Sequence, residues 1–116
     1  MKNKSILYVV NVDWFFISHR LVLAEEAKNN GYEVIVACKD TGRSQEIRDK
    51  GIRFINLSFS RSGTNPITEF KTLLNLFKLY NYVKPDIVHH ITLKPVIYGS
   101  IIAKILNIKG VVNAIS

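Results

Sequence analysis

The stretch that decides the fold of this 116-residue chain is Ser5–Cys38, which reads SILYVVNVDWFFISHRLVLAEEAKNNGYEVIVAC. An apolar run stands at each end of it, at Ser5–Val12 and at Glu33–Cys38. Between the two runs, Phe16–Asn30 repeats apolar residues at helical spacing, and Gly31 follows where a helix-capping glycine belongs. Strand, helix and strand in this order predict an α/β unit with two parallel strands.

The same alternation continues through the rest of the chain. Further strands are predicted at Ile52–Leu57, Asp86–His90 and Gly110–Ile115, and further helices at Arg43–Lys50, Pro66–Val83 and Leu93–Asn107. The strands are apolar without strict alternation, which is typical of a parallel sheet covered on both faces. In the helix Pro66–Val83, Asn65 is the expected cap, and the expected core side is formed by Ile67, Phe70, Leu74 and Phe77.

The length of one connection predicts the strand order. Ser58–Pro85 is much longer than the links before it, so we expect the chain to return there to the middle of the sheet. A doubly wound, Rossmann-like parallel sheet of order 3-2-1-4-5 follows. Its topological switch point lies between the first and fourth strands, where such sheets bind ligands. This selects two loops, Asp13–Ser18 and Ile91–Pro95.

Composition restricts the class of protein. The 47% hydrophobic residues can fill one core, so residues 1–116 are expected to form one domain. Sixteen Lys and Arg against nine Asp and Glu give a net charge of +7, which favours phosphorylated small molecules, nucleic acid or an anionic membrane face as partners. The single Cys38 favours a reducing compartment, and no signal peptide or membrane-spanning segment is predicted. The chain stops directly after an apolar strand, with no helix to cover it. We therefore expect that this chain is truncated or is half of a larger protein.

The first selected loop excludes some chemistries. It holds no glycine, so neither a dinucleotide fingerprint nor a phosphate-binding P-loop is present. The acidic cluster of a phospho-acceptor receiver domain is also missing, because Asp13 stands alone there. Asp13 is predicted either to accept a hydrogen bond from a sugar hydroxyl or to cap the helix. The aromatic side chains of Trp14–Phe16 have three possible roles: they stack against a sugar, they border a cleft, or they only pack in the core.

The second selected loop carries the other candidates. His90 ends its strand and is the candidate base or hydrogen-bond partner, whereas His89 is assigned a structural role. Thr92 is expected to cap the next helix, and Lys94 beside that helix start suits an anion. Arg61, in a loop of Ser and Gly residues, is either a phosphate contact or a solvated side chain. One Cys and three His at these separations predict no metal site.

At these residues the chain resembles the N-terminal domain of bacterial GT4-like glycosyltransferases of the GT-B fold, especially those that build capsule, O-antigen or exopolysaccharide. The resemblance covers nearly the whole chain. It is carried by Ile6–Val12 with Phe16 and His19-Arg20, Ala24–Val36, Ser60–Pro66, Lys84–His89, Thr92–Gly99 and Val112–Ser116. Two departures stand out: the loop after the first strand lacks the glycines of many relatives, and Ile91 stands where many have a histidine.

The resemblance implies a partner and a reaction. A C-terminal domain would bind a nucleotide-sugar as co-substrate, while this domain would shape the acceptor side, need no cofactor of its own and be inactive alone. His90 would contact or deprotonate an acceptor hydroxyl on a lipid-linked saccharide. Phosphate or sugar groups would be held by Thr92, Lys94 and Arg61, and the cleft floor would be lined by Asp13 and His19. A cytoplasmic place on the anionic inner membrane face, favoured by Lys71 and Lys78, is expected.

Two other functions remain open. Nucleotide-sugar 2-epimerases share the two-domain fold and need no acceptor. A non-catalytic module that binds anions or nucleic acid also fits the charge. The chain has no alternation of basic and aromatic residues and no recognition helix, so nucleic acid is a poor candidate partner.

Overall fold

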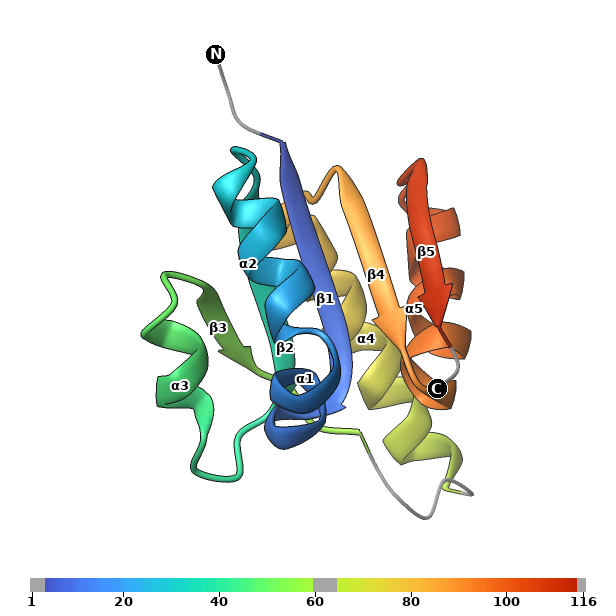
Figure 1. The fold of residues 1–116 in the computed structure, drawn as a ribbon. Coiled ribbons are helices and arrows are strands. Elements are labelled where there is room, and N and C mark those ends of the chain that lie inside the picture. Colours follow the sequence, from blue (N-terminus) through green and yellow to red (C-terminus); the bar gives the residue numbers. More distant parts are fainter. Residues whose placement is uncertain (1–3, 60–64, 115–116) are drawn as a thin grey trace.

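The computed structural model describes residues 4–59 and 65–114, which form a five-stranded sheet with helices on both faces (Figure 1). The strands are β1 (Ser5–Val12), β2 (Glu33–Lys39), β3 (Arg53–Asn56), β4 (Ile87–Ile91) and β5 (Gly110–Ala114). The helices are α1 (Asp13–His19), α2 (Leu21–Asn29), α3 (Ser44–Arg48), α4 (Pro66–Val83) and α5 (Leu93–Ile105). None of the helices described in these two ranges is long and apolar enough to cross a membrane.

The sheet has the predicted topology. All strand pairs are parallel and the order is β3-β2-β1-β4-β5, so the doubly wound, Rossmann-like α/β fold is confirmed. In the central strand β1, Val9 pairs with Ala37 of β2 on one side and with His90 of β4 on the other. From β1 the sheet grows outward through β2 to β3, and the chain then returns to place β4 on the other side of β1. The carboxyl ends of β1 and β4 are therefore the topological switch point.

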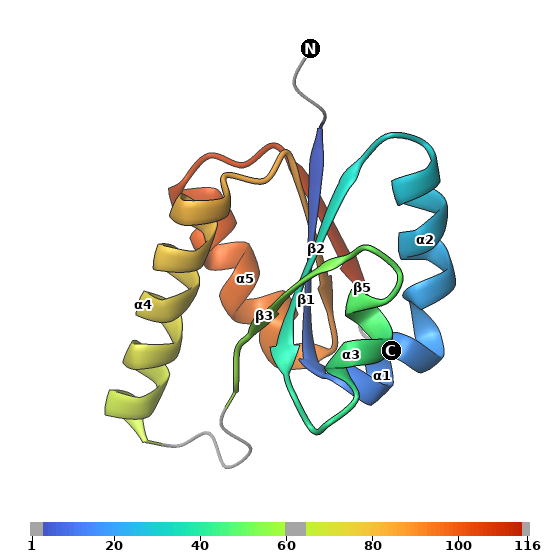
Figure 2. The same ribbon diagram turned by 90° about the vertical axis from the view of Figure 1, so that its left-hand side faces the viewer.

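Two cores lie on the two faces of the sheet. Helices α1, α2 and α3 cover one face, and α4 and α5 cover the other (Figure 2). Along β1, Tyr8 and Val10 point into the first core, while Leu7 and Val9 point into the second. A strand buried on both sides needs apolar residues at every position, because each buried aliphatic side chain contributes about 1.5–3 kcal/mol.

The first helix differs from its prediction. Instead of one helix over Phe16–Asn30, the chain forms α1 and α2, separated at Arg20, whose φ of −132° and ψ of −11° lie outside the helical range. Helix α1 begins directly at Asp13, so the predicted loop Asp13–Ser18 is helical. Its first turn is supported by the Asp13 carboxylate, which accepts a hydrogen bond of 2.8 Å from the Trp14 N–H.

The predicted ends of α2 and α3 and the predicted start of α4 are confirmed. Gly31 and Gly51 follow α2 and α3 with φ of 95° and 75°, in the left-handed region that favours glycine. The Asn65 side chain caps α4 by accepting a 3.0 Å hydrogen bond from the Ile67 N–H.

The predicted core side of α4 is wrong. Ile67, Phe70 and Leu74 are 68%, 66% and 42% exposed, and Phe77 is only partly buried. The buried side is formed by Thr72, Leu76 and Tyr80. Helix α4 is apolar on two sides, so spacing alone does not choose between them. Tyr80 is drawn inward because its hydroxyl finds a buried partner, His90 Nε2, at 2.7 Å.

Candidate functional site

A cleft of about 670 Å³ opens at the carboxyl ends of the strands, where β1 and β4 adjoin. The start of α1 and the start of α5, far apart in sequence, both line it, as the predicted switch point requires. Its described lining residues are Asn11, Val12, Trp14, Phe15, Lys39, Thr41, Phe59, Thr92, Leu93 and Lys94.

The lining combines flat apolar rings with hydrogen-bonding groups. Trp14 is 46% exposed, so much of its indole is open to solvent at the cleft. Lys39 and Lys94 bring two ammonium groups, and Asn11 and Thr41 bring an amide and a hydroxyl. Aromatic faces with converging donors and cations suit a polyhydroxylated or phosphorylated ligand.

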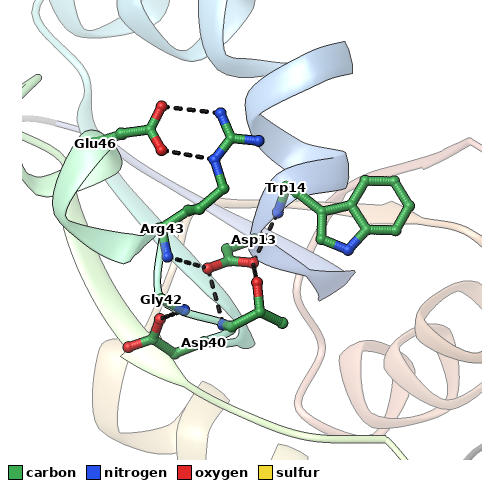
Figure 3. Close-up of polar contacts among 7 residues, drawn as sticks. Asp13, Trp14, Asp40, Gly42, Arg43 and Glu46 are labelled. Atoms are coloured by element: carbon green, nitrogen blue, oxygen red, sulfur yellow. Dashed lines mark hydrogen bonds and ion pairs between the residues drawn. The ribbon is translucent and has the colours of Figure 1, made fainter.

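Asp13 is fully buried and adjoins Trp14, which lines the cleft. Figure 3 shows the hydrogen bonds of its carboxylate with Trp14 and Arg43. Its carboxylate accepts hydrogen bonds from the Trp14 N–H (2.8 Å), the Thr41 N–H (2.9 Å), the Thr41 hydroxyl (2.6 Å) and the Arg43 N–H (3.0 Å). Burial raises the pKa of Asp13, but these hydrogen bonds outweigh burial and hold it below its ordinary value. Asp13 therefore orders Trp14 and Thr41, two of the residues that line the cleft.

The Thr41–Arg43 loop, to which Asp13 is hydrogen-bonded, is also stabilised by contacts of Asp40 and Arg43. The Asp40 carboxylate accepts hydrogen bonds from the Gly42 N–H at 2.8 Å and from the Ser44 hydroxyl at 2.9 Å. The Arg43 guanidinium makes two hydrogen bonds with Glu46, of 2.6 and 3.0 Å (Figure 3). The backbone of Thr41 is thus fixed at the cleft by contacts within and below its loop.

His90 is fully buried and does not appear among the described lining residues. Asn113 Oδ1 accepts from His90 Nδ1 at 2.8 Å, so Nε2 accepts from the Tyr80 hydroxyl at 2.7 Å. Burial lowers the pKa of His90, so the ring is neutral near pH 7. Both ring nitrogens are engaged by protein, and this arrangement suits a positioning role; the catalytic role remains a prediction.

Gly99 of α5 makes room for the His90 ring. A methyl group at this position would collide with the imidazole and would stand 2.8 Å from the Tyr80 hydroxyl oxygen. The glycine thus lets α5 pack directly over the ring, so that α4, α5, β4 and β5 meet at one neutral polar cluster.

Thr92 stands immediately before α5 in a strained conformation. Its φ of 72° and ψ of 170° belong to a region used almost only by glycine. The predicted cap is wrong, because the hydroxyl makes no capping hydrogen bond; Oγ1 is buried and has no partner among the described residues. The backbone is held instead by the Thr92 N–H, which donates to the Ala114 carbonyl at 2.8 Å. A β-branched residue is kept here against its conformational preference.

Lys94, in the first turn of α5, forms an ion pair of 3.3 Å with Glu69 of α4. Hydrogen bonds from Tyr98 and then Lys94 lower the pKa of Glu69 against the opposing effect of burial, so the pair is charged at neutral pH. The side chain of Lys94 is therefore tethered at the cleft wall rather than free to sample solvent.

His19 does not line the cleft. His19, at the exposed end of α1, stacks on Phe15 with ring centroids 4.2 Å apart and lies 3.1 Å from the Phe15 carbonyl oxygen through Nδ1. It is absent from the described lining, which it touches only through Phe15. Arg61 lies outside the described residues. Five residues that line the cleft were not predicted: Asn11, Val12, Lys39, Thr41 and Phe59. The signal that could have found them was their place near or after the carboxyl ends of strands.

The described residues contain no group of three or more His, Cys, Asp or Glu side chains able to hold a metal ion. The side chains that line the cleft offer hydrogen bonding, ring stacking and attraction of anions by two lysines.

The chain belongs to the glycosyl transferase 4-like family, whose family model matches residues 5–116. A comparison with curated proteins found no match. Because the match spans both loops of the switch point, the cleft described above lies within the family domain.

Solved structures share this fold. A glycosyltransferase from Rickettsia africae superposes with a TM-score of 0.75 at 16% identity, over 97% of this chain and 30% of that one. MurG of Acinetobacter baumannii gives 0.72 at 14% identity, over 96% and 35%. A UDP-N-acetylglucosamine 2-epimerase gives 0.69 at 20% identity, over 97% and 33%. The chain thus spans about a third of the length of these proteins, and at such identities the likeness shows the fold alone.

Proposed function

We propose that residues 1–116 are the acceptor-side, N-terminal domain of a bacterial GT-B glycosyltransferase that transfers a sugar from a nucleotide-sugar to a saccharide acceptor. In this reading the acceptor is lipid-linked, the product belongs to capsule, O-antigen or exopolysaccharide, and the enzyme works in the cytoplasm. A second, C-terminal domain would hold the donor, and the cleft would close between the two.

The observation that carries the proposal is the cleft at the β1–β4 switch point of a glycosyl transferase 4-like domain. Its exposed indole offers a face on which a sugar ring can stack, and its Asn11 amide and Thr41 hydroxyl offer hydrogen-bonding groups to sugar hydroxyls. Its two lysines suit the phosphates of a lipid carrier or of the donor.

The residues take distinct roles in this proposal. Trp14, Thr92 and Lys94 contact the acceptor or a phosphate, whereas Asp13 and His90 hold those residues in place from below. His19 supports Phe15 at the rim. The predicted phosphate contact of Arg61 stays part of the proposal.

The transfer itself makes one bond and breaks one. The acceptor oxygen bonds to the anomeric carbon, the bond from that carbon to the phosphate oxygen breaks, and the acceptor hydroxyl loses its proton. No described side chain at the cleft is a free general base, so the proton acceptor is assigned to the departing phosphate or to the second domain.

The test is sugar transfer by the full-length protein with a panel of nucleotide-sugars and lipid-linked saccharides. Lys94→Ala and Trp14→Ala are expected to lower kcat/KM at least about tenfold, since each removes a direct contact of about 1.4 kcal/mol or more. Lys109→Ala, an exposed lysine at the other end of the strands, is the matched control. Transfer that both cleft variants leave unchanged would refute the site.

A nucleotide-sugar 2-epimerase is the second candidate, and the likeness to a UDP-N-acetylglucosamine 2-epimerase favours keeping it. The two functions differ in their need for an acceptor. Incubation of the full-length protein with donor alone, followed by analysis of the sugar, separates them: an epimerised nucleotide-sugar without acceptor supports the epimerase.

A further inference from the structure

The two lysines of the cleft differ in their surroundings. Lys94 is paired with Glu69 at 3.3 Å, and the side chains of this pair are mostly covered, with exposed fractions of 24% and 16%. Lys39, the last residue of β2, is exposed and forms no ion pair with another residue that the structure describes. The positive charge of Lys94 is therefore balanced by protein, whereas that of Lys39 is directed to whatever enters the cleft.

The carboxylates near Lys39 are already hydrogen-bonded to other groups. Asp40, its neighbour in sequence, accepts two hydrogen bonds from its own loop, of 2.8 and 2.9 Å. Asp13 follows Val12, which pairs with Lys39 in the sheet, and its carboxylate accepts four hydrogen bonds. None of the ten described residues that line the cleft is Asp or Glu. An anionic group of a ligand is therefore the partner that the cleft leaves to Lys39.

The strand order places Trp14 between the two lysines. Lys39 ends β2, Trp14 follows β1 in the first turn of α1, and Lys94 follows β4 in the first turn of α5. Because β1 lies between β2 and β4, and adjacent strands are about 4.8 Å apart, the ends of β2 and β4 are about 10 Å apart. A sugar stacked on the Trp14 ring therefore has one lysine on either side in the order of the sheet. The start of helix α5 suits a phosphate beside Lys94, which leaves Lys39 to a group at the other side of the sugar.

We propose that the acceptor sugar bound at Trp14 is acidic and carries a carboxylate or a phosphate ester that pairs with Lys39. The inference rests on the proposed function, because it names the class of acceptor that this cleft takes. A hydrogen bond between an ammonium group and an anionic oxygen is stronger than one between an ammonium group and a neutral hydroxyl. Lys39 thus favours the acidic sugar over the neutral sugar with the same ring, and it determines specificity without taking part in the transfer step.

The test is titration calorimetry of the full-length protein with three para-nitrophenyl β-D-glucopyranosides that differ only at the exocyclic carbon. This carbon is a hydroxymethyl group in the glucoside, a carboxylate in the glucuronide and a phosphate ester in the third compound. The wild type is expected to bind one of the acidic compounds about fivefold more tightly than the glucoside, and the preferred one distinguishes carboxylate from phosphate ester. Lys39→Gln is expected to bind all three alike. Equal affinities in the wild type, or a preference that Lys39→Gln keeps, would overturn the proposal.

Two controls test whether Lys39 itself carries the preference. Lys109→Gln, an exposed lysine directly before β5 at the other end of the strands, should keep it. Lys94→Gln/Glu69→Gln removes the ion pair at constant net charge and should keep the ratio of affinities, so loss of the ratio there would assign the preference to Lys94 and overturn the proposal.

A third control uses inorganic phosphate as competitor. If it displaces the acidic compound at equal concentration, the cleft binds anions without regard to the sugar, and the proposal is wrong. Binding is measured without donor, so its outcome is independent of the transfer reaction. A preference found without transfer refutes only the proposed function, and transfer to a neutral acceptor without any preference refutes only the assignment of Lys39.

Discussion

Two buried polar side chains, Asp13 and His90, support the two walls of the cleft in different ways. Asp13 is a charged group surrounded by four donors, three of them backbone or side-chain groups of the Thr41–Arg43 loop. His90 is a neutral ring between Tyr80 and Asn113, under a glycine of α5. The first orders a loop that has little packing of its own, whereas the second joins elements that already pack against each other.

This difference predicts which of the two cleft walls loses more stability when its buried polar side chain, Asp13 or His90, is removed. Without Asp13, three donors of the Thr41–Arg43 loop lose their acceptor, and this exposed loop has few apolar contacts to replace those bonds. Without His90, a cavity forms between packed helices and strands, and its walls are held by the surrounding core.

The largest effect is expected for Asp13→Ala, which should lower the free energy of unfolding by about 4 kcal/mol because a buried charge and its four hydrogen bonds are lost. Urea denaturation measures it. Thr41→Val removes one of these bonds at nearly constant shape and should cost about 1 kcal/mol. If Asp13→Ala costs no more than Thr41→Val, Asp13 is not the anchor of this wall.

The next effect tests the His90 wall. Gly99→Ala should cost about 3 kcal/mol, because the added methyl group collides with the His90 ring and approaches the Tyr80 hydroxyl to 2.8 Å. Thermal and urea unfolding report it.

The control for Gly99→Ala is its combination with His90→Ala. The double variant Gly99→Ala/His90→Ala should be more stable than the sum of the single losses predicts, since the methyl group then occupies space that the ring has left. Additive losses would mean that the ring and the helix are not in direct contact.

A smaller effect separates the two walls by pH. His90 has a folded pKa below that of the unfolded chain, about 6.5, so its contribution to stability is complete above pH 6.5 and is lost as the pH falls below it. Asp13 also has a lowered folded pKa, but its contribution is lost only below the unfolded value of about 3.9.

The free energy of unfolding should therefore fall by about 1 kcal/mol between pH 7.5 and 5.5, and His90→Gln should flatten this decline. His89, whose pKa is lowered by burial and by neighbouring Arg20 and His90, contributes in the same range, so His89→Gln is the reference variant. A decline that His90→Gln leaves unchanged would contradict the neutral-anchor assignment.

The smallest effect concerns the strained residue between the walls. Thr92→Gly should raise the free energy of unfolding by about 1 kcal/mol, because glycine adopts a φ of 72° with a ψ of 170° without strain. In the full-length protein it should also lower sugar transfer, since the Thr92 side chain no longer lines the cleft. Asn107→Gly, at a milder φ of 58°, should change neither measurably. Lower stability of Thr92→Gly would show that contacts of the threonine outweigh its strain.

Much of the fold follows from local pattern. Apolar runs, glycine caps and the Asn65 cap act within a few residues, so they could be read directly. The position of the cleft followed as well, because the long connection before β4 forces the strand order. The prediction was wrong for the core side of α4, since Ile67 and Phe70 are as apolar as Leu76 and only packing against the sheet distinguishes them.

The amino-acid sequence by itself determined the order of the parallel strands and the edge of the sheet at which the cleft opens, because chain connectivity and side-chain periodicity fix both. Only the tertiary structure decided that Asp13 and His90 lie beneath the cleft rather than in it. Their partners, Thr41, Tyr80 and Asn113, are 28, 10 and 23 residues away along the chain. Whether a polar group faces solvent or is satisfied inside depends on such distant neighbours, and no local pattern encodes them.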